Sequence, residues 1–205
     1  MCRFIETIRI EHGRAHNLTR HEQRMEATCR HFGFQAPLAE LNRICNHPTL
    51  PRRLSKLRIV YGPEGIVETS YTPYSIRKVD TLGLVDGFDI DYSYKFLNRN
   101  CINQLKDGNS HFDEIIIVRH GLITDTSYTN LAFFDGRTWF TPRTPLLPGT
   151  MRARLLEEGR LTLCDIRPSG LNVFSHVALI NAMLNLGELQ LPINRITNRQ
   201  PRHHP

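Results

Sequence analysis

The chain has 205 residues, of which 40% are hydrophobic and 22% charged, a composition typical of a globular protein with a sizeable core. No apolar run approaches the roughly 18 residues that a membrane-spanning helix needs. The N-terminus carries no apolar signal core, so we expect a cytoplasmic protein with no membrane partner. The five cysteines are scattered and never spaced as Cys-x-x-Cys, which argues against a disulfide framework or a zinc site.

The formal net charge of +6 raises the question of nucleic-acid binding. The basic residues are spread along the chain, however, and no dense basic run or basic-aromatic motif concentrates them. We therefore predict no nucleic-acid partner and keep a basic nucleic-acid-binding protein only as an alternative. A surface of this sign would draw anionic substrates toward the protein.

The first 50 residues predict one strand and two helices. Apolar residues alternate over 3–10, which favours a strand. The next segment begins a helix with a capping-box pattern at Thr19 and ends it at Gly33, where a glycine can adopt the left-handed conformation. A second helical pattern covers residues 37–46.

A change of period at residue 57 indicates strands. Residues 57–61 and 66–71 flank a Gly-Pro-Glu-Gly turn and predict a hairpin. Together with the preceding elements they form a small α+β domain over residues 1–85. Residues 81–91, which hold two glycines and three aspartates, are interpreted as the connection to a second domain.

The second domain is predicted over residues 86–200, with residues 201–205 as a tail. Its patterns indicate helices over 95–106 and 151–158, and strands over 114–118, 122–124, 130–134, 138–141 and 177–180.

Three places in the second domain carry residue types suited to chemistry. The first is Gly149-Thr150, directly before a helix, where backbone N–H groups, the helix dipole and a hydroxyl would bind phosphate. The simpler interpretation is that Pro-Gly-Thr only begins the helix.

Lys95 is the second candidate, because it is one of only four lysines and stands among aromatic and apolar residues. Burial lowers the pKa of a lysine, which suits a lysine that forms a Schiff base. The alternative is a lysine on a helix flank that extends its ammonium to solvent.

Asp125 is the third candidate, in a polar connection between two apolar strands. It could lie as an acidic partner at the bottom of a cleft. Ordinary turn chemistry, in which Asp, Ser, Thr and Asn bond their own backbone, explains the same residues.

Taken together, these segments resemble one family. Residues 113–118, the Thr-Pro at 141–142 and the Leu-Pro-Gly-Thr-Met-Arg run at 147–152 are similar to the signature of fold-type IV pyridoxal-phosphate enzymes. That group is the class IV aminotransferase and 4-amino-4-deoxychorismate lyase family. The segments Phe4–Arg9, His21–Met25, Lys95–Asn98, Ile180–Met183 and Leu191–Ile193 also resemble its motifs in order and spacing.

The resemblance implies a fold, a cofactor and roles for particular residues. The fold would be α+β, two-domain and D-amino-acid aminotransferase-like (a fold-type IV PLP enzyme), N-terminally shortened, with Asp125 where the family usually has Glu. The cofactor would be pyridoxal 5'-phosphate, with Lys95 as the Schiff-base lysine, general base and general acid. Asp125 would keep the pyridine nitrogen protonated. The phosphate would be held by residues of three segments: Arg24, Gly149, Thr150, Met151, Asn181 and Ala182.

The resemblance also bears on the reaction. Met151, Lys95–Arg99 and Ile180–Met183 are lyase-like, so we expect a 4-amino-4-deoxychorismate lyase that releases pyruvate and 4-aminobenzoate, a reaction of folate biosynthesis. The alternatives are an amino-acid transaminase of the branched-chain or D-amino-acid type and a non-catalytic PLP-binding protein. In each catalytic case the substrate is a small anionic amine and the protein is expected to be a homodimer.

Overall fold

The computed structural model describes residues 2–197 and divides the chain into two compact units. Unit 1 comprises Met1–Ile76 and Tyr92–Asn98, and unit 2 comprises Arg77–Asp91 and Arg99–Pro205. The division therefore crosses the expected boundary at residue 85, because the chain enters unit 2, returns to unit 1 and leaves it again. The proposed tail at 201–205 lies outside the described residues.

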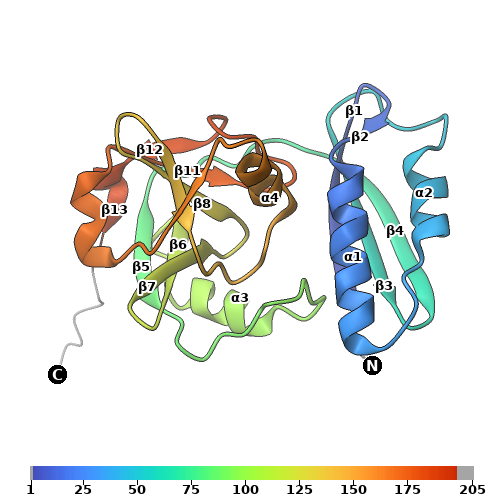
Figure 1. Ribbon diagram of the computed structural model, residues 1–205, viewed down its shortest axis with the longest axis horizontal. Helices are drawn as coiled ribbons and strands as arrows, with labels where there is room; N and C mark the ends of the chain where they lie inside the picture. The colour runs from blue at the N-terminus through green and yellow to red at the C-terminus, as the bar shows by residue number, and fades with distance from the viewer. Residues whose placement is uncertain (1, 198–205) are drawn as a thin grey trace. The chain divides into compact units, whose positions relative to one another are not determined.

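Unit 1 is a four-stranded antiparallel sheet with two helices, shown in Figure 1 with the helices beside the strands. The sheet order is β2-β1-β3-β4. Its elements are β1 (Phe4–Glu11), β2 (Arg14–Ala15), α1 (Leu18–Phe32), α2 (Leu38–Cys45), β3 (Ser55–Gly62) and β4 (Gly65–Pro73). These confirm the predicted strand, both helices and the hairpin.

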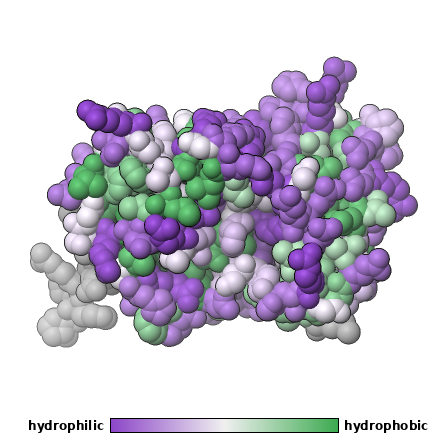
Figure 2. All heavy atoms as spheres, viewed as in Figure 1, coloured by the Kyte–Doolittle hydropathy of each residue, from purple (hydrophilic) through white to green (hydrophobic). Residues whose placement is uncertain are grey.

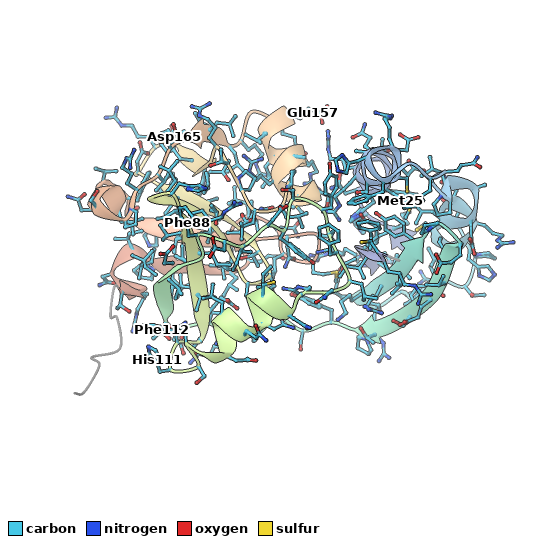
Figure 3. All side chains as sticks on the ribbon, turned by 90° about the horizontal axis from the view of Figure 1, so that it is seen from below. Met25, Phe88, His111, Phe112, Glu157 and Asp165 are labelled. Atoms are coloured by element: carbon cyan, nitrogen blue, oxygen red, sulfur yellow. The ribbon has the colours of Figure 1, made fainter. Side chains whose placement is uncertain are left out.

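The core of unit 1 lies between one face of the sheet and the helices. Alternate residues of β1 and β3, such as Ile8 and Leu57, pair across the strands and pack against Met25 of α1, which is labelled in Figure 3. The predicted cap of α1 is wrong: Asn17, in the left-handed conformation with φ 57°, precedes the helix, and no side chain caps it. The prediction that Gly33 ends the helix is confirmed.

The segment around Lys95 pairs with β1 instead of forming a helix. Ile5 donates its backbone N–H to the carbonyl of Lys95 at 2.9 Å, and Leu97 donates to the carbonyl of Arg3 at 2.8 Å. Phe96 forms an isolated antiparallel bridge with Phe4. The predicted helix over 95–106 is therefore wrong at its start, because backbone groups of residues 95 and 97 bond to an edge of β1.

As far as residue 197, unit 2 contains two sheets and two α-helices, with sheet orders β10-β9-β8-β11-β12 and β13-β5-β6-β7. Its helices are α3 (Asn100–Asp107) and α4 (Thr150–Glu157), and two 3₁₀ turns cover Pro168–Val173 and Ile193–Arg195. Its strands are β5 (Leu82–Asp86), β6 (Glu114–Arg119), β7 (Leu122–Thr126), β8 (Asn130–Phe134), β9 (Trp139–Pro142), β10 (Thr162–Cys164), β11 (His176–Ile180), β12 (Gln190–Pro192) and β13 (Ile196–Thr197).

The interpretation of residues 81–91 as a plain connection is wrong, because β5 lies within them. β5 pairs in parallel with β6 and with β13. Gly83 is required where it lies: a Cβ there would come within 2.1 Å of the ring of Phe112, which is labelled in Figure 3. In the sequence Gly83 resembles a turn residue, but in the structure it makes room for the aromatic ring of Phe112.

The largest core cluster of unit 2 joins residues from both of its sheets. Leu82, Ile116 and Phe133 are completely buried within it. On the visible face of each unit, Figure 2 shows apolar side chains in separate patches divided by hydrophilic ones. Within residues 2–197, no helix is long and apolar enough to cross a membrane, and no three His, Cys, Asp or Glu residues are grouped to hold a metal ion.

Replacing Phe133 by Ala tests this core. The ring is fully buried, so its loss should lower the free energy of unfolding by about 3–5 kcal/mol, from lost burial and the cavity left behind. The matched control is Phe88→Ala, at a side chain 56% exposed, which should cost less than about 1 kcal/mol. Urea unfolding of both variants measures the difference, and equal costs would contradict the assignment of the core.

Candidate active site

Unit 1 contains a buried cluster of Glu6, His21 and Arg24. Glu6 lies on β1, and the other two lie one helical turn apart on α1. Arg24 donates Nε to Glu6 Oε1 at 2.8 Å and Nη2 to Oε2 at 2.5 Å, and His21 Nδ1 lies 2.6 Å from Oε2. The side chains of Glu6 and His21 are completely buried, and that of Arg24 is 14% exposed. The cluster therefore connects the helix to the sheet through charged side chains.

The charges within this cluster follow from its contacts. Burial acts to raise the pKa of Glu6, but Arg24 and His21 outweigh it and hold that pKa at about 2. Burial lowers the pKa of His21, against the opposing effect of its bond to Glu6. Burial also acts to lower the pKa of Arg24, and Glu6 raises it overall. At neutral pH the cluster holds one carboxylate, one guanidinium and a neutral imidazole.

Lys95 lies in the same unit, half-buried, in the segment that pairs with β1. Its carbonyl accepts from Ile5, the residue next to Glu6. After burial, which is the main cause, the positive charge of Lys95 is among the effects that lower the pKa of His21. Lys95 is therefore placed near the cluster that contains Arg24.

In unit 2, Asp125 lies on β7 and is 4% exposed. Its two oxygens have different donors: Asn130 Nδ2 donates to Oδ1 at 2.8 Å, and the Leu147 N–H donates to Oδ2 at 2.9 Å. Burial raises the pKa of Asp125 to about 6, although these hydrogen bonds and the charge of Arg152 oppose the rise. A cation brought to this carboxylate would restore its ionised form.

Gly149 lies where α4 begins, as predicted. A Cβ at this position would come within 1.9 Å of Asn130 Oδ1, so only glycine fits beside that amide. The N–H groups of Thr150 and Met151 precede the first hydrogen bond of the helix, from Ala153 N to Gly149 O at 2.9 Å. The side chain of Met151 is buried in a core cluster, which leaves its backbone N–H as the group it could offer a ligand.

Asn181 and Ala182 form a tight turn after β11. Asn181 and Leu184 exchange backbone hydrogen bonds at 3.2 and 3.1 Å, and Asn181 Oδ1 accepts from the N–H groups of Met183 and Leu184. Asn181 Nδ2 donates to the carbonyl of Tyr128 at 3.3 Å. This turn is thereby joined to the segment that follows Asp125.

The structure distributes the predicted residues over both units. Unit 1 carries Arg24 and Lys95, and unit 2 carries Asp125, Gly149, Thr150, Met151, Asn181 and Ala182. The prediction assigned no role to Asn130, whose side chain contacts Asp125, the 143–149 loop and the space beside Gly149. Its position opposite Ile180 in the β8–β11 pair also brings it next to the Asn181 turn. The sequence signal that could have indicated this role is an asparagine at the first position of a buried strand.

These groups suit a ligand with a phosphate and a basic ring nitrogen. The buried carboxyl group of Asp125 has a raised pKa, because burial outweighs its hydrogen bonds and the charge of Arg152, and a further cation beside it would favour its ionised form. Gly149 directly precedes α4, and the backbone N–H groups at the N-terminus of a helix favour a phosphate. The residues present therefore fit pyridoxal 5'-phosphate.

Comparison with known proteins identifies the family. The model of the amino-transferase class IV family matches residues 3–190. The chain belongs to this family, whose members are PLP-dependent enzymes. The prediction of the fold-type IV fold and of the cofactor is thereby confirmed.

Individual proteins similar to this chain can be aligned with it over nearly its whole length. A "putative 4-amino-4-deoxychorismate lyase" from Haemophilus somnus 129PT is 34% identical, with a TM-score of 0.82 over 91% of this chain and 98% of that one. An uncharacterized protein of Haemophilus influenzae is 35% identical over 91% of this chain and all of its own length. A hypothetical aminotransferase of Mycobacterium tuberculosis in its PLP-bound form shares the fold at 18% identity, with a TM-score of 0.79, over 99% and 84%.

Gly149→Ala tests the space beside Asn130. The added Cβ would displace the amide that holds Asp125, so we expect the free energy of unfolding to fall by about 1–3 kcal/mol and PLP retention to weaken. Gly170→Ala, where an added Cβ meets no atom within 4 Å, is the control. Denaturation and cofactor absorbance after dialysis measure both effects. A Gly149→Ala protein that retains PLP as wild type does would refute the assignment.

The pKa of Asp125 predicts a pH dependence for the protein without its cofactor. Because burial raises this pKa from 3.8 to about 6, the folded state holds the proton more tightly than the unfolded state. The contribution to stability is therefore complete below about pH 4 and declines as pH rises to about 6, by about 3 kcal/mol.

Urea unfolding of wild type and Asp125→Asn between pH 4 and 7 measures this dependence as a difference between the two proteins. Asp165→Asn, at an exposed carboxylate labelled in Figure 3, is the control. A wild type that gains stability relative to Asp125→Asn over this range would reverse the predicted sign.

Proposed function

We propose that the protein is a 4-amino-4-deoxychorismate lyase, which releases pyruvate and 4-aminobenzoate. The observation that carries the proposal is the 34% identity with the Haemophilus somnus protein, which extends over 91% of this chain. The substrate class is a small anionic amine, and the basic net charge of +6 favours its approach. We further propose that the protein acts as a cytoplasmic homodimer.

Each unit supplies part of the proposed machinery. From unit 1, Lys95 would hold the cofactor covalently and Arg24 would bind its phosphate. From unit 2, Asp125 would be the partner of the ring nitrogen. The backbone N–H groups of Gly149, Thr150 and Met151 and the Asn181–Ala182 turn would bind the phosphate. The burial of Asp125 and the position of Gly149 directly before α4 support these assignments.

Pyridoxal phosphate, when bound, withdraws electrons from the carbon that carries the amino group of the substrate. Lys95 Nζ takes the proton from that ring carbon, as a general base. The bond from the ring to the enolpyruvyl oxygen then breaks, the ring becomes aromatic, and the departing enolpyruvate gains a proton to become pyruvate. Asp125 would hold a proton on the pyridine nitrogen, because a cation beside this buried carboxyl group favours its ionised form.

Product analysis tests the reaction. The holoenzyme should convert aminodeoxychorismate into 4-aminobenzoate and pyruvate in equal amounts, with no keto acid added, since no amino group is transferred. Lys95→Ala should reduce turnover to background, because the base is lost, whereas Lys78→Ala, at an exposed lysine of unit 2, should not. The measurement is chromatography of 4-aminobenzoate together with an enzymatic assay of pyruvate.

A second measurement separates the lyase from a transaminase. An amino acid such as glutamate, leucine or D-alanine, given alone, should leave the visible absorbance of the cofactor in place. Stoichiometric bleaching by one of these donors, together with no 4-aminobenzoate from aminodeoxychorismate, would assign the protein as an amino-acid transaminase instead.

A further inference from the structure

Glu6 has no role in the proposed reaction, yet its carboxylate is held by three hydrogen bonds in the interior of unit 1. It is completely buried and accepts hydrogen bonds from Arg24 at two oxygens and from His21 at one. The two bonds from Arg24 are parallel, one from Nε and one from Nη2, which fixes the plane of the guanidinium as well as its position. Met25, labelled in Figure 3, marks the position of the helix that carries Arg24.

The remaining edge of Arg24 is the part that a ligand can use. Within residues 2–197, no hydrogen bond is made by Arg24 Nη1, whereas Nε and Nη2 are both committed to Glu6. A guanidinium can bind one anion through each of two of its edges. Glu6 therefore holds one edge and leaves the other available to an anionic group.

The same strand also sets the backbone of Lys95. Ile5 donates to the Lys95 carbonyl, and Glu6 is the next residue of β1. We infer that Glu6 is a positioning residue, which orients Arg24 for the cofactor phosphate. Glu6 lies on the same strand that holds the Lys95 backbone. This inference rests on the proposed function, in which Arg24 binds the phosphate.

The rival explanation is a buried ion pair that only stabilises unit 1. Such a pair would affect every ligand of the site alike, through the stability of the fold. A positioning role affects the phosphate alone, because Glu6 acts through Arg24. The comparison of pyridoxal 5'-phosphate with pyridoxal, which lacks the phosphate, separates the two explanations.

The experiment measures the dissociation constants of both ligands for the folded apoprotein by absorbance titration. In Glu6→Gln, the amide cannot accept both Arg24 bonds, so the guanidinium loses its fixed plane. We expect pyridoxal phosphate to bind about 10–100-fold more weakly, and pyridoxal to bind within about threefold of wild type. The matched control is Glu11→Gln, which removes a carboxylate on the same strand that binds Arg9 through Nε and Nη2; it should leave both constants unchanged.

A second variant covers the case in which Glu6→Gln does not fold. Glu6→Asp keeps the negative charge but is one methylene shorter, and should weaken pyridoxal phosphate binding selectively, to a smaller extent. A variant that weakens both ligands equally, or neither, overturns the inference. Arg24→Gln distinguishes this failure from that of the proposed function: if it leaves pyridoxal phosphate binding unchanged, the assignment of Arg24 to the phosphate is itself wrong.

Discussion

The hydrogen bonding of β1 on both of its edges is the constraint on which unit 1 depends. One edge pairs with β3 along seven residues, from Phe4 to Ile10. The other edge pairs with β2 at its end and with residues 95–97 at its beginning. The side chains of β1 that face α1 complete the arrangement, because Glu6 binds Arg24 and His21 there. A single eight-residue strand thus determines where the lysine backbone, the arginine and the sheet lie with respect to one another.

Unit 2 depends in a similar way on one asparagine. The two N–H bonds of the Asn130 amide lead to Asp125 and to the Leu147 carbonyl, so two segments 22 residues apart are held by one side chain. Its oxygen occupies the space that a Cβ at Gly149 would need. Buried amides are well suited to this task, because they donate and accept without adding a charge that would have to be compensated. In the proposed function, the carboxyl group of Asp125 is the one that meets the ligand.

Elements with strong local patterns were predictable from the sequence, and those formed by distant pairing were not. The helices at 18–32 and 38–45 and the hairpin at 55–73 follow from periodicity and turn residues. The segment at Lys95 could not be foreseen, because its conformation is set by Ile5, 90 residues earlier. β5 was missed for the same reason, since its parallel partners lie elsewhere in the chain and Gly83 resembles a turn residue. The family motifs located the candidate site residues because they combine side chains that no local pattern connects. The roles of Glu6 and Asn130 could not be predicted in this way, because they follow from hydrogen bonds that only the structure shows.

The path of the chain between β5 and β6 has a consequence for how the protein can be divided. These two strands pair in parallel, yet the residues that connect them include Tyr92–Asn98, which belong to the other unit. A gene fragment that ends after residue 85 would encode the sheet of unit 1 without the segment on its β1 edge, and without Lys95. Recombination at that point could not exchange one unit for another. The complete unit 1 is therefore encoded by two separate stretches of sequence, and only a chain that extends past residue 98 contains all of it.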